Sequence, residues 1–416
     1  MSEMLETAGL TEEQVSRAFA FTDEVVEGFP GRVTGTEALR GAALRIRDEF
    51  AKYCDPGSAK IEEFDVHPGS FLKYLPGLTV LYFAAAILLY FNLPWPALAA
   101  IAMAIFAFTG QFLLYWHLLD PLFPKRRGYN VIGRIEPEGE VKQQIIIGAH
   151  HDAAYVFHLL ACAPRLYFPL MRAGMAVMLL ALLACLAAAV LSLFAVALPQ
   201  WVSIAFLAMG VFVLPFLFFT TGQVVPGAGD NMVAVAIAGE VGRIFGAAKR
   251  PGEGLLKNTR VVLASFDAEE CGMRGARAFV TQHRQEMAAI KTYVLNMDTL
   301  YRLKDLNFFR ADRNSMVRLS YLMALECRDI ARAMGYRATV SSMSPGGGHT
   351  DAAAFGEAGI AATNLCAMSY NRMKEYHPWV YHTANDVSKY IERPLVAACI
   401  GIIREYILKK DAEQGK

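Results

Sequence analysis

The chain has 416 residues, of which 55% are hydrophobic, and its mean hydropathy is +0.30. These values are too high for an ordinary soluble protein, so part of the chain is expected to lie in lipid. The formal net charge of +1 argues against a nucleic-acid-binding protein, which needs excess basic side chains to neutralise phosphates. The seven cysteines are an odd number without CxxC spacing, which indicates neither a disulfide framework nor a zinc ribbon and fits reduced thiols facing a cytosol.

The N-terminal part predicts two amphipathic helices and a strand. Apolar and charged positions alternate at helical spacing over residues 10–55, with Thr11 as an N-cap and a break at Gly31–Thr36. Lys60–Val66 alternates like a half-exposed strand. The first residues, MSEMLETAGLTEEQ, are acidic and lack the basic and apolar regions of a secretory signal, so we expect membrane insertion to use internal segments.

Two long runs without a charged residue predict two transmembrane hairpins, four helices in all. The first run extends from Tyr74 to Leu119 and is split by the sequence NLPWP into two pieces of the length that spans hydrocarbon. The second extends from Ala173 to Gly229 and is broken at LPQW. Buried helices of a soluble protein are the alternative, but the runs are too long for it.

Basic residues flank these runs on one side only, whereas the two opposite turns carry no charge. This asymmetry predicts a multi-pass protein of the cell (inner) membrane with its soluble part on the cytoplasmic side. The flanking basic residues are Lys73, Lys125, Arg126, Arg127, Arg165 and Arg172.

Outside the hairpins the pattern predicts an α/β sheet covered by helices, with functional groups at strand ends. Tyr129–Ile135 and Gln144–His151 are expected to pair antiparallel, so both hairpins leave from one sheet edge. Further strands are expected at Val261–Phe266, Thr292–Met297 and Gly359–Cys366, and helices at Gly229–Phe245, from near Ala276, Leu319–Met334 and Glu392–Lys409.

Two adjacent glutamates, Glu269 and Glu270, follow the apolar run Val261–Phe266. Neighbouring residues of an extended segment point in opposite directions, so one carboxylate can bind a metal while the other faces a substrate. Taken alone, the pair is more typical of a solvated acidic turn before a helix, and only the other motifs of the chain favour a catalytic pair.

Four further places offer metal ligands at strand ends or in loops. His150 and Asp152 share one face of an extended segment, so Asp152 can orient the imidazole of His150. Asp230 opens a predicted helix, where it could also be a plain N-cap. Asp298 follows an apolar strand, and His382 lies in the sequence VYHTAND.

In order and local context, these places resemble the motifs of the co-catalytic di-zinc aminopeptidase family, which also holds glutamate carboxypeptidases and glutaminyl cyclases. The matching segments are GAHHDA, GAGDNMVAVA, FDAEECGMRGARAF, NMD and YHTAND. They extend from about Tyr129 to His382, with the hairpins as insertions. The resemblance implies a mixed sheet sandwiched by helices and two Zn²⁺ per chain.

The resemblance also assigns a role to each residue. His150 and Glu270 would be terminal ligands of different ions, Asp230 the bridge, and Asp298 and His382 the remaining ligands. Glu269 would be the general base toward a hydroxide shared by the ions. Asp152 would orient His150, Tyr381 would bind the tetrahedral intermediate, and Asp351 would sit behind His382. The departures from the motifs are Gly229, Val233–Ala234 and Thr350–Ala352, none of which is a ligand.

The expected function is that of a membrane-embedded aminopeptidase acting on apolar or membrane-associated peptides. An amide hydrolase acting on a lipid or N-acyl amino acid from the bilayer is one alternative, and a non-catalytic membrane scaffold is another. The expected partners are the lipid bilayer and a peptide or lipid-amide substrate, with no nucleic acid. The expected division is residues 1–70 (N-terminal helices and first strand), 71–120 (first hairpin), 121–157 (catalytic), 158–225 (interfacial segment and second hairpin) and 226–416 (catalytic).

Overall fold

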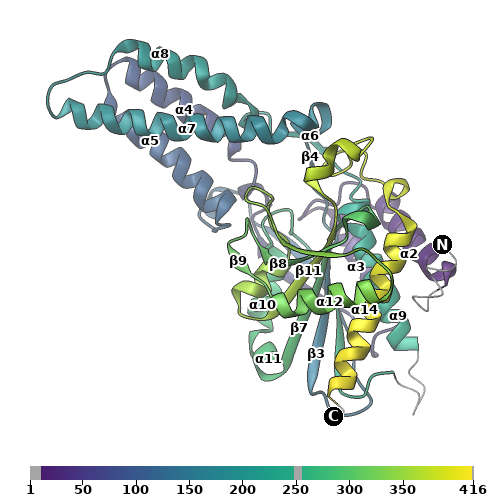
Figure 1. Ribbon diagram of the computed structural model, residues 1–416. Coiled ribbons are helices and arrows are strands. Elements are labelled where there is room, and N and C mark those ends of the chain that lie inside the picture. Colours follow the sequence, from purple (N-terminus) through teal and green to yellow (C-terminus); the bar gives the residue numbers. More distant parts are fainter. Residues whose placement is uncertain (1–10, 248–254, 415–416) are drawn as a thin grey trace.

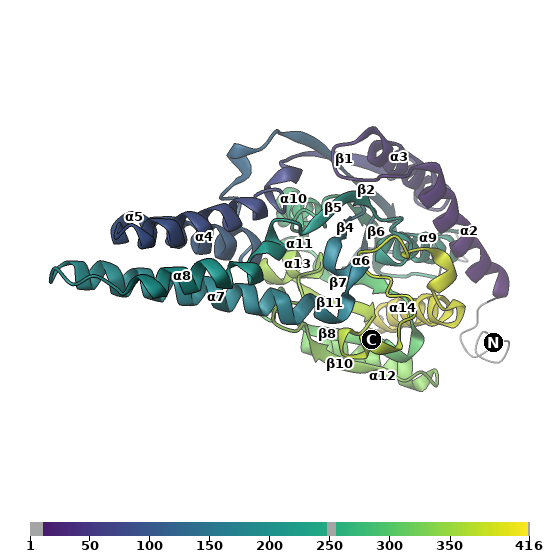
Figure 2. The same cartoon turned by 90° about the horizontal axis from the view of Figure 1, so that it is seen from above.

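The computed structural model describes residues 11–247 and 255–414, which form an α/β domain and a helical extension that projects from it (Figures 1 and 2). Four apolar helices make up the extension and run away from the domain (Figure 2). They are α4 (Leu75–Tyr90), α5 (Pro94–Phe108), α7 (Pro164–Ser192) and α8 (Gln200–Met209). The predicted α/β class is confirmed.

The main sheet has nine strands in the order β1-β2-β6-β3-β7-β11-β8-β10, with β9 paired to β8. Its central strands β6, β3, β7 and β11 are parallel, and antiparallel pairs adjoin them on both sides, so the sheet is mixed as expected. The strands are β1 (Lys60–Val66), β2 (Arg126–Ile135), β3 (Gln143–His150), β6 (Thr259–Phe266), β7 (Lys291–Leu300), β8 (Asn307–Asp312), β9 (Val317–Arg318), β10 (Thr339–Ser342) and β11 (Ala361–Ala367). A separate ribbon pairs β4 (Tyr155–Phe157) with β5 (Thr220–Val224).

The expected pairing of β2 with β3 is wrong, because β6 lies between them. β6 pairs antiparallel with β2, as in Val131 with Ser265, and parallel with β3, as in Ile147 with Leu263. A strand buried on both faces pairs with whichever apolar strand completes the sheet, and that partner comes more than a hundred residues later in the sequence. Since β2 is still antiparallel to β3 across β6, the start of β2 and the end of β3 remain at the same edge.

Helices cover both faces of the sheet, and each face has its own apolar core. The first face carries α2 (Glu12–Gly28), α3 (Glu37–Ala51), α9 (Val233–Ala247), α12 (Tyr321–Ala333) and α14 (Arg393–Glu413). The second carries α10 (Arg274–Gln282), α11 (Arg284–Ala289) and α13 (Ala352–Glu357). The sheet is therefore sandwiched by helices, as the pattern of elements predicts.

Local sequence signals set the N-terminal helices as expected. Thr11 caps α2 through a capping box with Gln14, and Thr36 caps α3 by accepting from the backbone N–H of Leu39. Such side-chain caps satisfy N–H groups that have no partner within the helix. The break predicted at Gly31–Thr36 separates the two helices.

Three helical segments of the extension are long and apolar enough to cross a membrane, judged by length and composition: Pro68–Tyr90, Pro94–Leu113 and Pro164–Ser192. The fourth expected segment, Gln200–Phe212, is shorter. After Met209 the chain turns into the 3₁₀ turns Gly210–Phe212 and Leu214–Phe216, and Pro215 cannot donate the backbone hydrogen bond that would continue α8. The count of four spanning helices therefore stays a prediction.

The parallel strands β3, β6 and β7 end at one edge of the sheet, which we call the site edge. His150 is the last residue of β3, Glu269 and Glu270 follow β6, and Asp298 lies near the end of β7. The chain also leaves β3 here, through β4 and α6 (His158–Cys162), to enter α7. The topology thus brings the chemically active side chains and the base of the extension to one place.

Candidate metal centre

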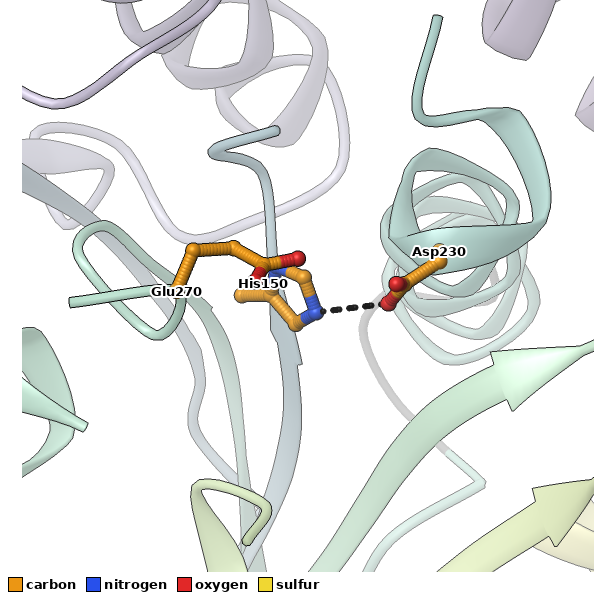
Figure 3. Close-up of side chains that lie close together, drawn as sticks. All are labelled: His150, Asp230 and Glu270. Atoms are coloured by element: carbon orange, nitrogen blue, oxygen red, sulfur yellow. Dashed lines mark ion pairs between the residues drawn. The ribbon is translucent and has the colours of Figure 1, made fainter. Parts of the chain in front are cut away.

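Three of the predicted ligands converge at the site edge. Ligand atoms of His150, Asp230 and Glu270 all lie within 4.8 Å of one another (Figure 3). The closest contact is 3.3 Å, between His150 Nε2 and Asp230 Oδ1. Asp230 lies in an irregular turn before α9 and not on a regular helix, with φ of −125°. Since α9 begins only at Val233, Asp230 is not the N-cap residue of that helix.

His382 faces the same group from the opposite side of Asp230. Its Nε2 is 3.3 Å from Asp230 Oδ2 and 3.5 Å from Glu270 Oε1. One carboxylate oxygen of Asp230 thus faces His150 while the other faces His382. A carboxylate placed between two imidazoles in this way can bridge two cations.

The donor atoms fit a zinc ion. His150 Nε2, Asp230 Oδ2 and Glu270 Oε1 are buried, yet none of them has a hydrogen-bond partner within the described part of the chain. Buried polar atoms without hydrogen bonds are costly, and bound positive charge would compensate them. Imidazole nitrogen with carboxylate oxygen is a ligand set that Zn²⁺ accepts.

Electrostatics favours a cation in the same place. Burial raises the pKa of Glu270 well above its ordinary value, and the nearby Asp230 carboxylate raises it further. Burial alone would lower the pKa of His150, but its contacts with Asp152 and Asp230 raise it well above its ordinary value. A site with this many buried acidic groups is stabilised by added positive charge.

Asp298 lies at the site edge, but among the described residues it is not part of the group whose ligand atoms all lie within 4.8 Å of one another. One of its carboxylate oxygens accepts a hydrogen bond of 2.6 Å from the Thr299 hydroxyl. Burial raises its pKa to about 7, and the charge of His150 opposes this shift. The described residues therefore contain one compact three-ligand group, and a second ion stays a prediction.

Asp152 holds the two segments that carry His150 and the glutamate pair. Its Oδ1 is 3.3 Å from His150 Nδ1. Its two carboxylate oxygens also accept the backbone N–H groups of Glu269 and Glu270, at 3.2 and 3.1 Å. The carboxylate therefore fixes both the orientation of the imidazole and the start of the turn after β6.

The two adjacent glutamates point toward different imidazoles. The carboxylate of Glu270 faces His382, whereas Oε1 of Glu269 is 3.1 Å from Nε2 of His349. Burial raises the pKa of Glu269 well above its ordinary value, and the charge of His150 lowers it. The side chains diverge as adjacent residues of an extended segment do, so Glu269 is left outside the ligand group.

Two other predicted residues differ in their placement. Tyr381 lines the cavity at the site and its ring stacks on His382, with ring centroids 4.0 Å apart. Asp351 is buried at the start of α13 with both carboxylate oxygens unpartnered, and no contact joins it to His382 in the described structure. The expectation that Asp351 sits behind His382 therefore stays a prediction, and the ring seen against His382 is that of Phe157, with centroids 4.2 Å apart.

Sequence reasoning missed two residues that hold the ligands in place. Asp386 accepts the backbone N–H groups of Gly229 and Asp230, at 2.7 and 3.3 Å. Arg32, fully buried, donates to the backbone carbonyls of His151, Pro226 and Gly227. Asp386 belongs to the YHTAND segment and could have been noticed there, whereas no local signal singles out Arg32.

The departure at Gly229 has a steric reason. A Cβ atom at this position would lie 2.1 Å from Cε1 of the Tyr301 ring, so only glycine fits. The acidic side chain expected here from the motif is therefore replaced by a buried aromatic ring. Asp386 supplies the nearest carboxylate to this backbone instead.

A cavity of about 330 Å³ opens at the site edge. Besides the ligands and Glu269, its wall has an apolar part and a polar part. Several residues of the apolar part come from the ends of the extension and β4: Phe71, Leu72, Phe112, Tyr115, Phe157 and Tyr167. Large apolar side chains thus stand next to the polar centre.

Comparison with known proteins finds one family match, which covers less than half of the chain. Residues 215–407 match the profile of peptidase family M28, a stretch that includes four of the five predicted ligands but not His150. The chain matches no curated protein.

Solved structures share the fold at low sequence identity. A Zn-dependent exopeptidase from Parabacteroides distasonis is 14% identical, with 95% of this chain and 97% of that chain covered and a TM-score of 0.54. A zinc aminopeptidase from Bacillus subtilis is 14% identical (94% and 95% covered, TM-score 0.55), and a glutaminyl cyclase from Fimbriiglobus ruber is 12% identical (95% and 94% covered, TM-score 0.55). The family match and the fold together support a zinc metallopeptidase.

Proposed function

We propose, from the M28 match and the metal centre, that the chain is a membrane-embedded zinc-dependent aminopeptidase that removes N-terminal residues from apolar or membrane-associated peptides. The observation that carries this proposal is the convergence of buried, unpartnered ligand atoms of His150, Asp230 and Glu270 beside an unligated Glu269. A metal-dependent hydrolase uses this combination of a Lewis acid and a free base.

In this proposal His150, Asp230, Glu270 and His382 hold zinc, which when bound acts as a Lewis acid toward the scissile carbonyl. Glu269 takes the proton of the attacking water and delivers it to the leaving amine. Asp152 keeps the imidazole of His150 oriented throughout, and Tyr381 lies at the cavity wall where its hydroxyl can donate to the reacting oxygen.

We further propose two zinc ions per chain, with Asp230 between them. The two carboxylate oxygens of Asp230 face different histidines, and this favours a bridge over a terminal ligand. Asp298 would complete the ion on the His150 side and Glu270 the ion on the His382 side.

The extension is proposed to span the inner membrane. Its helices expose large apolar side chains that water would not tolerate as one surface, among them Phe91 (65% exposed) and Trp201 (68% exposed). Basic residues such as Arg126 and Arg165 stand at the domain end of the extension and favour a cytoplasmic active site. The apolar part of the cavity wall would then face substrates that enter along the bilayer surface.

A second candidate function is hydrolysis of a lipid amide or an N-acyl amino acid. Beyond the ligands and Glu269, the carboxylate that lines the cavity is Asp305, and it is engaged by Arg372 and the Tyr376 hydroxyl, both at 2.8 Å. Within the described lining no other carboxylate is free to bind the α-amine of a peptide. This observation favours a substrate whose amine is acylated.

Activity profiling of detergent-purified protein decides between these functions. The proposal predicts turnover of aminoacyl amides that is abolished by zinc chelation and by Glu269→Gln. Turnover confined to N-acyl amide probes would replace the aminopeptidase by the second candidate. No turnover of aminoacyl, peptidyl or N-acyl amide probes by zinc-replete protein would contradict both.

A further inference from the structure

His349 stands between the metal centre and the base of the first apolar hairpin. It follows three glycines in the loop between β10 and α13, and its side chain is 8% exposed. Its Nε2 lies 2.9 Å from the backbone carbonyl oxygen of Glu269 and 3.1 Å from Oε1 of the same residue. The imidazole thus touches the backbone and the side chain of Glu269 at once.

The backbone contact fixes which nitrogen carries the proton. A carbonyl oxygen can only accept, so Nε2 of His349 must donate. The same N–H then also faces the carboxylate of Glu269 as a shared donor. In the described structure this is the one hydrogen-bonding or ionic contact of the Glu269 side chain, which lies among other buried acids.

Two aromatic rings pack against the imidazole, and a third packs behind one of them. The ring centroid of Tyr115 is 4.4 Å and that of Phe71 is 5.9 Å from that of His349. Phe71 also stacks on Phe112, with centroids 5.6 Å apart. We call Phe71, Phe112 and Tyr115 the aromatic shelf; they flank α4 and α5 at the domain end of the hairpin.

The shelf also contacts the turn that carries Glu269. Gly272 has φ of +95°, and a Cβ there would lie 3.2 Å from the Tyr115 ring. The Arg277 side chain donates to the backbone carbonyl of Tyr115 at 2.5 Å. The shelf therefore packs against His349 and adjoins the turn and the helix that follow Glu269.

We propose that His349 is a positioning residue that fixes the carboxylate of Glu269, and that the aromatic shelf of the first hairpin holds His349 in place. The first hairpin is then part of the catalytic apparatus as well as a membrane segment. This inference rests on the proposed role of Glu269 as general base.

The test compares His349→Phe, which keeps a ring but removes the donor, with His349→Gln, whose amide can still donate. We expect His349→Phe to lower kcat roughly 10- to 100-fold, since misplacing a reacting group by about 1 Å costs on the order of 10²-fold. KM is expected to stay within about twofold and zinc content unchanged, and His349→Gln should recover most of kcat. The exposed His158→Gln is the matched control.

A purely structural role would instead lower zinc content and thermal stability in both variants alike. A kcat of His349→Phe within about twofold of the parent would overturn the proposal. Tyr115→Leu should also lower kcat, but by less than His349→Phe does. Phe91→Leu, at the far end of the hairpin, should leave kcat unchanged. Equal effects of these two would overturn the role of the shelf.

A second measurement does not depend on turnover. In a double-mutant cycle of His349→Phe with Glu269→Gln, the shifts in thermal midpoint should be non-additive because the residues are in contact. Additive shifts would contradict the contact. If the contact is confirmed but no amide probe is turned over, the proposed function fails while the pairing stands.

Discussion

The site edge and the helical extension differ in the side chains that they hide from solvent: the site edge buries polar groups, whereas the extension exposes apolar ones. At the site edge, polar groups are hidden from solvent, with His150 and Asp152 each 1% exposed. In the extension, large apolar groups point outward, with Phe194 73% and Trp201 68% exposed. Each arrangement is unfavourable in water unless a partner compensates it. We infer that the compensating partners are a cation in the first region and lipid in the second.

The largest expected effect is the loss of turnover in variants of the two neighbouring glutamates at the site edge, which should differ in zinc content. Glu269→Gln should lower turnover by about 10²–10⁴-fold with zinc retained, because only the base is lost. Glu270→Gln should lose zinc as well as turnover. Metal analysis and kinetics on both variants measure this, and equal zinc contents would mean that the division of roles is wrong.

An arginine placed at an exposed apolar position of the extension, and another placed on the α/β domain, tests whether each surface faces lipid or water. Leu183 on α7 is 60% exposed and Leu322 on α12 is 74% exposed. Leu183→Arg should cost about 2.5–3.5 kcal/mol of membrane insertion, whereas Leu322→Arg should change stability by less than about 0.5 kcal/mol. Insertion and thermal-stability assays on both variants measure these effects. Similar small effects would mean that the extension faces water.

Replacing the buried Arg32 tests how much its hydrogen bonds stabilise the site edge. Arg32→Met leaves the carbonyls of His151, Pro226 and Gly227 without this donor, and should lower the free energy of unfolding by about 1–3 kcal/mol. Arg47, which pairs with Asp48 on the surface of α3, is the control, and Arg47→Met should cost less than about 1 kcal/mol. Denaturant unfolding measures both variants, and equal losses in the free energy of unfolding would contradict a stabilising role of Arg32 at the site edge.

Local patterns predicted most of the fold, and long-range pairing was where they failed. Thr11, Thr36 and the period of the apolar residues locate α2 and α3, because capping and amphipathicity act within a few residues. The placement of β6 between β2 and β3 depends on segments more than a hundred residues apart. Hydrophobic alternation gives each strand but not its neighbour.

The same limit applies to the site. The candidate ligands could be picked out because each lies in a short motif at a strand end or in a loop. No local pattern marks His349 as a partner of Glu269, since Glu269 and the aromatic shelf come from distant segments. The sequence did not mark Arg32, because an arginine is expected at the surface as long as its buried hydrogen-bond acceptors are unknown.

Zinc content of the purified, metal-replete protein tests the central claim most directly. Elemental analysis should find close to two Zn²⁺ per chain, retained in Glu269→Gln and reduced in Asp230→Ala and His382→Ala. A stoichiometry near zero, or full zinc content in both of the last two variants, would contradict a metal centre at the site edge.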